Sequence, residues 1–154
     1  MKKNVTLLLL TGIMVCAQSC SRQANEKIVF VCEHGAARST IASVYFNKRA
    51  REENLPYRSV FRGLDPDPVI TTQTIAGLRR DGFETDELST SLLTPHDTVS
   101  TFLMISLDCH LPSYYVTDHN WTGIPPISED YPAARDEILR HVDELIIELK
   151  TKKH

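Results

Sequence analysis

The sequence contains little cysteine, four residues in 154, and they form neither a CxxC pair nor a cluster with histidine. This scarcity excludes a disulfide framework and a zinc site built from closely spaced ligands. A basic surplus is also missing, since 17 Lys and Arg stand against 20 Asp and Glu. Without a positive field to hold a phosphate backbone, the chain is predicted to have no nucleic-acid partner.

Internal repeats and low-complexity tracts are absent, which excludes solenoids and other repeat architectures. The chain is 42% hydrophobic, enough to build one ordinary core. Its length is that of one domain. We therefore expect a single compact unit.

The only long apolar run stands at the start of the sequence, over residues 5–15. Two lysines precede it, and small and polar residues follow it up to Cys20, an order typical of an export signal. We predict a signal over residues 1–19 and lipidation of Cys20, which would anchor an exported protein in the bacterial periplasm or outer membrane. An unlipidated cleaved signal and a chance hydrophobic start are the alternatives. A transmembrane anchor is disfavoured, because a spanning helix needs roughly 20 apolar residues.

Residues 20–26 are polar and predict a tether, so the folded domain is expected over residues 27–154. Short apolar runs rich in branched side chains predict strands at residues 27–32, 57–63 and 101–107, with 114–121 as a candidate fourth. Helical spacing of apolar residues predicts helices at residues 38–54, at 71–83 and from residue 133 onward. Strands alternating with helices favour an α/β domain whose parallel sheet is covered on both faces.

The stretch VCEHGAARST, residues 31–40, joins the first predicted strand to the first helix. Ligands of open parallel sheets bind beyond the carboxyl ends of the strands, and this strand ends at Cys32. The loop between Cys32 and Arg38 consists of Glu33, His34, Gly35, Ala36 and Ala37. Three of these five are small, so the loop can curl until its N–H groups point inward beside the positive end of the helix. The sequence therefore predicts a nest for a tetrahedral oxyanion.

Three side chains around this loop predict nucleophilic chemistry. Arg38, at the start of the helix, is placed to form a bidentate fork with two oxygens of the anion. The same positive environment favours a thiolate at Cys32, which makes it a nucleophile. Ser39 is placed to donate a hydrogen bond to that thiolate. The alternative is a buried core thiol beside a surface arginine, because this spacing also occurs by chance.

The stretch VFVCEHGAARSTIA resembles the phosphate-binding loop of the low-molecular-weight protein tyrosine phosphatase superfamily, which includes thiol-dependent arsenate reductases. The stretches FRGLDPDP, GLRRDGF, SLLT and TFLMISL follow in the order of that superfamily. The resemblance implies a single-domain, three-layer α/β sandwich with a four-stranded parallel sheet flanked by helices. It also implies Cys32 as the nucleophile, Arg38 as the oxyanion ligand and Ser39 as support for the thiolate, without a metal or organic cofactor. Gly35 stands where the phosphatases commonly have asparagine. Both residue types adopt left-handed backbone angles, so the loop shape is expected to persist.

The sequence departs from the superfamily at the general acid. The superfamily uses an aspartate directly before a proline, whereas the corresponding stretch here, NWTGIPPISEDY, has Pro125 and Pro126. We predict that Asp130 supplies the proton instead, with Glu129 and Asp118 as alternatives. A positioned acid contributes about 10²–10⁴-fold to a rate.

Cys109 follows the third predicted strand, close to the position of a resolving cysteine in thioredoxin-coupled arsenate reductases. Those enzymes carry a second resolving cysteine, which has no counterpart here. Cys109 is therefore interpreted as a resolving thiol, a protecting thiol for Cys32 or a small loop residue.

The predicted activity is hydrolysis of a phosphomonoester, on a protein such as a phosphotyrosyl protein or on a small molecule, through a phosphocysteine intermediate. Reduction of arsenate with a thiol reductant or Cys109 is one alternative. A non-catalytic module that binds oxyanions is the other.

Overall fold

The computed structural model describes residues 26–152. The predicted export signal, Cys20 and the tether up to residue 25 lie outside this range. The sheet has four parallel strands in the order β2-β1-β3-β4. The strands are β1 (Glu26–Cys32), β2 (Tyr57–Gly63), β3 (Thr101–Leu107) and β4 (His119–Trp121). The predicted four-stranded parallel sheet is therefore confirmed, with the fourth strand shorter than the candidate segment.

The two central strands are β1 and β3, and their sequences explain that position. Residues 28–32 of β1 and 103–107 of β3 are all buried. A strand that is apolar on both faces must be covered on both, which holds only in the middle of the sheet. The edge strand β2 is less buried, with three buried residues, three half-buried residues and one exposed residue.

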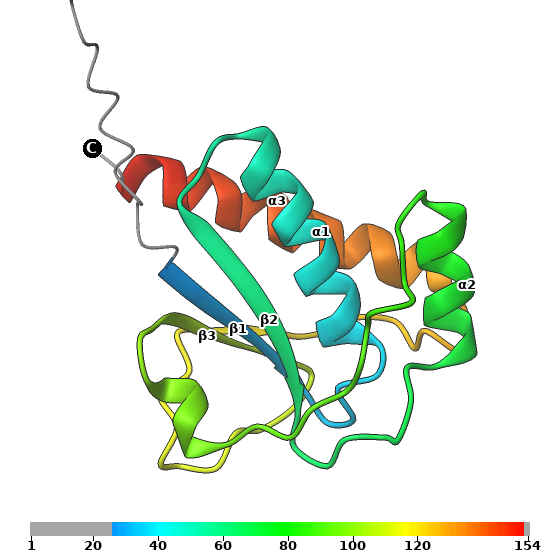
Figure 1. The fold of residues 1–154 in the computed structure, drawn as a ribbon, viewed down its shortest axis with the longest axis horizontal. Helices are drawn as coiled ribbons and strands as arrows, with labels where there is room; N and C mark the ends of the chain where they lie inside the picture. The colour runs from blue at the N-terminus through cyan, green and yellow to red at the C-terminus, as the bar shows by residue number, and fades with distance from the viewer. Residues whose placement is uncertain (1–25, 153–154) are drawn as a thin grey trace, which may run out of the picture.

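Three helices lie on one side of the sheet (Figure 1). They are α1 (Arg38–Glu52), α2 (Thr72–Arg80) and α3 (Tyr131–Lys152). The apolar positions that predicted the last helix, Ala134, Ile138, Val142, Leu145, Ile146 and Leu149, are all buried. They pack with side chains of α1 and with Ile28, Phe30 and Ile105 of the sheet in the larger core cluster.

The opposite face of the sheet carries a thinner third layer. It consists of the 3-10 helix η1 (Pro95–Thr98) and the loops before and after β3. A smaller core cluster, Val29, Val31, Leu93, Met104, Cys109 and Tyr115, lies under this layer. The two central strands are thus buried from both sides although the α-helices gather on one.

Asp81, at the end of α2, joins the three helices. Its Oδ2 accepts hydrogen bonds from the hydroxyls of Tyr45 on α1 (2.7 Å) and Tyr131 on α3 (2.9 Å). Its Oδ1 accepts from Nη1 of Arg135 (3.1 Å). Burial opposes ionisation of Asp81, but these hydrogen bonds and the arginine charge outweigh it and hold the pKa of Asp81 below its usual range. The end of α2 is therefore fixed to α1 and to the first turns of α3.

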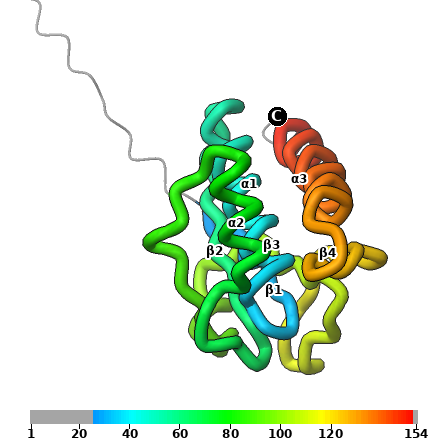
Figure 2. The backbone as a smooth tube through the Cα atoms, turned by 90° about the vertical axis from the view of Figure 1, so that its right-hand side faces the viewer, coloured from blue at the N-terminus to red at the C-terminus, as the bar shows by residue number. Residues whose placement is uncertain are grey.

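The strand order predicts that a ligand binds at the carboxyl ends of the strands. The chain leaves β1 toward β2 on one side and returns to β3 on the other, so the order reverses between β1 and β3. The carboxyl ends of strands at such a switch point form a crevice where ligands bind. Figure 2 shows the loop after β1 at this end of the sheet. Within residues 26–152, no helix is long and apolar enough to cross a membrane.

Candidate active site

The loop after β1 has its carbonyl groups bonded on its outer side. The carbonyls of Cys32, Glu33, His34 and Ala36 accept hydrogen bonds from backbone amides of residues 64–71, at 2.9 to 3.2 Å. The carbonyl of Gly35 accepts from the hydroxyl of Thr40 at 3.0 Å. The amides of residues 33–37 donate to no acceptor in the described chain. This arrangement leaves five N–H groups for the inner side of the loop, as in an anion nest.

Two glycines determine how tightly this loop is held. Gly35 has a φ of 60°, and a Cβ placed on it would lie 2.7 Å from the backbone nitrogen of Gly63. A Cβ on Gly63 would lie 2.8 Å from the nitrogen of Gly35. Each glycine therefore makes room for the other, and the end of β2 braces the loop. The left-handed angle expected at Gly35 is present, and the proximity of Gly63 adds a steric requirement that the sequence did not indicate.

The sulfur of Cys32 lies beside the hydroxyl of Ser39. The Sγ to Oγ distance is 3.1 Å, and the same hydroxyl donates to the carbonyl of Arg62 at 3.3 Å. Because Ser39 has a single hydroxyl proton, it can stabilise a thiolate by turning that proton from the carbonyl to the sulfur. The residue predicted to support the thiolate is thus in contact with it.

The guanidinium of Arg38 contacts the ends of two other segments. Its Nη2 donates to the carbonyl of Ile124 at 3.4 Å, and its Nε lies 3.5 Å from Oδ2 of Asp108. The carboxylate of Asp108 also accepts hydrogen bonds from the amides of Gly123 (2.8 Å) and Ile124 (3.0 Å). Asp108 therefore holds Arg38 and the loop after β4 together. The sequence analysis did not identify Asp108, although its position directly after β3, at the carboxyl end where Cys32 also lies, is a signal that could have indicated it.

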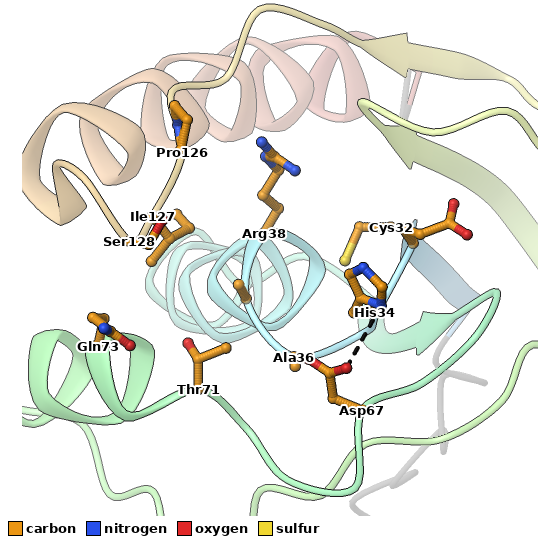
Figure 3. Close-up of a pocket in the computed structure, with 12 residues that line it drawn as sticks. Cys32, His34, Ala36, Arg38, Asp67, Thr71, Gln73, Pro126, Ile127 and Ser128 are labelled. Carbon is orange, nitrogen blue, oxygen red and sulfur yellow. Dashed lines mark ion pairs between the residues drawn. The ribbon is translucent and has the colours of Figure 1, made fainter.

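A cavity of about 210 Å³ opens above the loop. Its lining comes from three segments: the loop itself, residues 67–73 before and within α2, and residues 126–128 before α3. Figure 3 shows Cys32 and His34 on one side of this space, with Thr71, Gln73, Ile127 and Ser128 on the other. The predicted oxyanion loop thus lines an open cavity, whose far wall comes from segments distant in sequence.

No protein-family model and no curated protein matches the sequence significantly. Solved structures do match. YfkJ from Bacillus subtilis is 16% identical and has a TM-score of 0.74, with 86% of this chain and 99% of YfkJ covered. For a low molecular weight protein tyrosine phosphatase from T. tengcongensis the identity is 18% and the TM-score 0.66, with 80% and 99% covered. For an arsenate reductase in the phosphate binding state the identity is 19% and the TM-score 0.68, with 80% of this chain and 98% of the reductase covered.

The chain has the fold of low-molecular-weight protein tyrosine phosphatases and arsenate reductases. The predicted fold is therefore confirmed. Because enzymes with both activities share this fold, the choice between their reactions depends on the side chains of the site.

The carboxylates predicted as general acids lie away from the cavity lining. Oδ1 of Asp130 accepts the amide of Ala133 at 2.9 Å, so its carboxylate caps α3. Glu129 is exposed and is also absent from the cavity lining. Oδ2 of Asp118 accepts the amide of Met104 in the middle of β3 at 2.8 Å. The structure brings Cys32, Arg38 and Ser39 together but does not bring Asp130 to them.

Cys109 faces the opposite side of the sheet from Cys32. Its Sγ donates to the carbonyl of Val31 at 3.5 Å, and it belongs to the smaller core cluster, whereas Cys32 belongs to the larger one. Burial raises the pKa of Cys109 to about 11. A thiol in these surroundings stays protonated near neutral pH, and the thiolate is the nucleophilic form.

Sequence reasoning missed the residues that complete the cavity wall. Thr71 and Gln73 belong to the start of α2, and Pro126, Ile127 and Ser128 to the loop before α3. None of these residue types indicates chemistry on its own, and only the folded chain places them here. In the part of the chain that the structure describes, no three His, Cys, Asp or Glu side chains are grouped to hold a metal ion.

Proposed function

We propose that the protein hydrolyses phosphomonoesters through a covalent phosphocysteine formed at Cys32. The observation that carries this proposal is the loop of residues 33–37, whose N–H groups lack protein acceptors while the sulfur of Cys32 lies at its base. A phosphoryl group has the charge and shape that such a nest binds. The described lining contains no Phe, Tyr or Trp side chain, so a small phosphomonoester fits this site better than a phosphotyrosyl ring that needs stacking.

The proposed reaction has two steps. In the first, the thiolate of Cys32 attacks phosphorus, an S–P bond forms and the P–O bond to the leaving group breaks. The loop amides and Arg38 stabilise the charge on the three equatorial oxygens. Ser39 supports the thiolate before attack and again when it departs. In the second step, water attacks phosphorus, the S–P bond breaks, and inorganic phosphate leaves.

The position of Cys109 favours hydrolysis over reduction by an internal thiol. An arsenate reductase that used Cys109 would need its thiolate to reach a sulfur on the other side of β1. Its burial, its raised pKa and its bond to the Val31 carbonyl oppose this route. Arsenate reduction with an external thiol remains the second candidate, because arsenate has the charge and tetrahedral shape of phosphate and an arsenate reductase shares the fold.

Parallel assays of the same preparation test the proposal. We expect wild-type protein to release phosphate from an aryl phosphate without added thiol, and mass spectrometry of acid-quenched enzyme to show a phosphoryl group on Cys32. The Cys32→Ser variant should do neither. Thiol-dependent loss of arsenate without any aryl phosphate hydrolysis would replace the phosphatase by the reductase. Binding of phosphate with neither reaction would indicate a non-catalytic module.

A further inference from the structure

The cavity has no ionisable side chain from the segment where the superfamily resemblance places the acid. That wall is formed by Pro126, Ile127 and Ser128. The ionisable residues that do line the cavity are Cys32, Glu33, His34, Arg38 and Asp67. Cys32 is the nucleophile and arginine stays charged at any working pH, so neither supplies the leaving-group proton.

His34 lies at the rim of the cavity with one ring nitrogen engaged. Its Nδ1 is 3.3 Å from the carbonyl oxygen of Asp65 and 3.6 Å from Oδ1 of Asp67. A carbonyl and a carboxylate both act as acceptors, so Nδ1 carries the proton in the neutral ring. Nε2 is then the nitrogen that gains and loses a proton. In Figure 3 the imidazole stands between Cys32 and Asp67, and the ion pair is drawn at the ring nitrogen that faces Asp67.

The position of the His34 imidazole agrees with the direction in which the leaving group departs. Attack by Sγ at the base of the loop sends the leaving oxygen out on the opposite side of phosphorus, toward the mouth. His34 lines the cavity and its side chain is 60% exposed, so it lies where the cavity meets solvent. A catalytic acid must come within hydrogen-bond reach of the leaving oxygen in the bound complex.

We propose that His34 is the general acid of the hydrolysis and that Asp67 orients its ring, an inference that rests on the proposed phosphatase function. In the first step the electron pair of the breaking P–O bond takes the proton from Nε2 of the imidazolium, and the alcohol leaves. In the second step the neutral Nε2 takes a proton from water as the water oxygen attacks phosphorus. The S–P electrons return to Cys32, and the imidazolium is restored.

Charged side chains surround the ring. Asp67 and Glu33 are carboxylates that line the cavity with it, and Arg38 is a cation in the same lining. The carboxylate of Asp65 lies on the segment that braces the loop. Imidazoles titrate between about pH 5 and 8, so an acid of this type predicts a rate that falls as the pH rises through that range.

The test compares two leaving groups in the full-length protein. Phenyl phosphate needs a proton on its leaving oxygen, whereas dinitrophenyl phosphate leaves as a stable anion. We expect His34→Gln to lower kcat for phenyl phosphate by about 10²–10⁴-fold and to change kcat for dinitrophenyl phosphate by less than about tenfold. The inhibition constant of inorganic phosphate should stay close to that of the wild type, showing that the loop is intact. His96→Gln, an exposed histidine on η1, is the matched control.

The pH profile gives a second measurement. The wild-type kcat for phenyl phosphate should fall on the alkaline side, and His34→Gln should lose that dependence. Asp67→Asn should lower kcat for phenyl phosphate and leave kcat for dinitrophenyl phosphate nearly unchanged, because the ring loses the carboxylate that orients it. A purely structural role for Asp67 would slow the two substrates alike.

The outcomes separate this inference from the proposed function. If wild type hydrolyses both substrates and His34→Gln slows them equally, His34 is not the acid although the phosphatase stands. A selective loss with phenyl phosphate in Asp130→Asn, and not in His34→Gln, would assign the acid to the loop before α3. If wild type hydrolyses neither substrate, both proposals fall together.

Discussion

The two cysteines of the described chain follow the two central strands at the same edge of the sheet, yet their surroundings differ. Cys32 ends β1 beside a loop with five unbonded amides, a serine hydroxyl and the start of α1. Cys109 comes two residues after β3, among Val31, Met104 and Tyr115 under the thinner layer. One sulfur opens onto a cavity, and the other bonds to a backbone carbonyl.

This contrast shows that the carboxyl edge of a parallel sheet does not by itself make a thiol reactive. The backbone conformation after the strand decides whether the thiol is reactive. After β1, Gly35 takes a positive φ, and the amides of the loop are left without acceptors in the described chain. After β3, Asp108 takes the positive φ, 46°, and turns its carboxylate toward Arg38 while Cys109 goes into the core. The segment after β3 thus supports the loop that follows β1.

The largest effect is expected for the nucleophile. Cys32→Ser should abolish turnover of aryl phosphates while phosphate still binds, because the amides and Arg38 remain. Phosphate release and calorimetric titration with inorganic phosphate measure the two properties. The same substitution at Cys109 should preserve turnover. Activity in Cys32→Ser, or its loss in Cys109→Ser at unchanged stability, would reverse the roles assigned to the two sulfurs.

The next largest effect concerns the backbone of the first loop. Gly35→Ala combines a left-handed φ with a Cβ 2.7 Å from Gly63, so we expect a loss above about 4 kcal/mol in the free energy of unfolding, the range of severe substitutions. Gly82→Ala is the matched control: its φ is 86°, and a Cβ there meets nothing within 4 Å. Its free energy of unfolding should fall only by the cost of the left-handed φ, about 1–2 kcal/mol. Urea unfolding measures both, and equal losses would mean that the approach of Gly63 does not matter.

Arg38→Ala should weaken oxyanion binding and lower kcat/KM together. Hydrogen bonds to charged groups contribute about 1.5–3 kcal/mol, so the inhibition constant of phosphate should rise about 10- to 150-fold. Arg51→Ala, an exposed arginine near the other end of α1, is the control and should change neither value. An unchanged inhibition constant in Arg38→Ala would show that the amides alone hold the anion.

The smallest effect belongs to the second thiol. Burial raises the pKa of Cys109 to about 11, whereas an exposed thiol titrates near about pH 8.5. The stability that this shift contributes is present below the unfolded value and is lost as the pH rises through about 8.5 to 11. Cys109→Ala should therefore be less sensitive to alkali than wild type in thermal unfolding followed from pH 7 to pH 10. An identical alkaline decline in both proteins would mean that Cys109 titrates as an exposed thiol.

The sequence alone determined the elements and the reactive loop. The strands at residues 57–63 and 101–107 were predicted to the residue, because branched runs bounded by turn residues are local signals. The loop from Cys32 to Arg38 was predicted for the same reason, since its nucleophile, small residues and arginine are contiguous.

Tertiary structure alone decided what surrounds that loop. The approach of Gly63 to Gly35, the contact of Asp108 with Arg38 and the pairing of Asp67 with His34 join residues 28 to 70 positions apart. Asp130 was predicted as an acid from its place in the chain, and the structure shows its carboxylate accepting the amide of Ala133 at the start of α3. Spacing along the chain limits which residues can meet. Which of them do meet depends on how the helices pack on the sheet, because that packing sets the direction of each side chain.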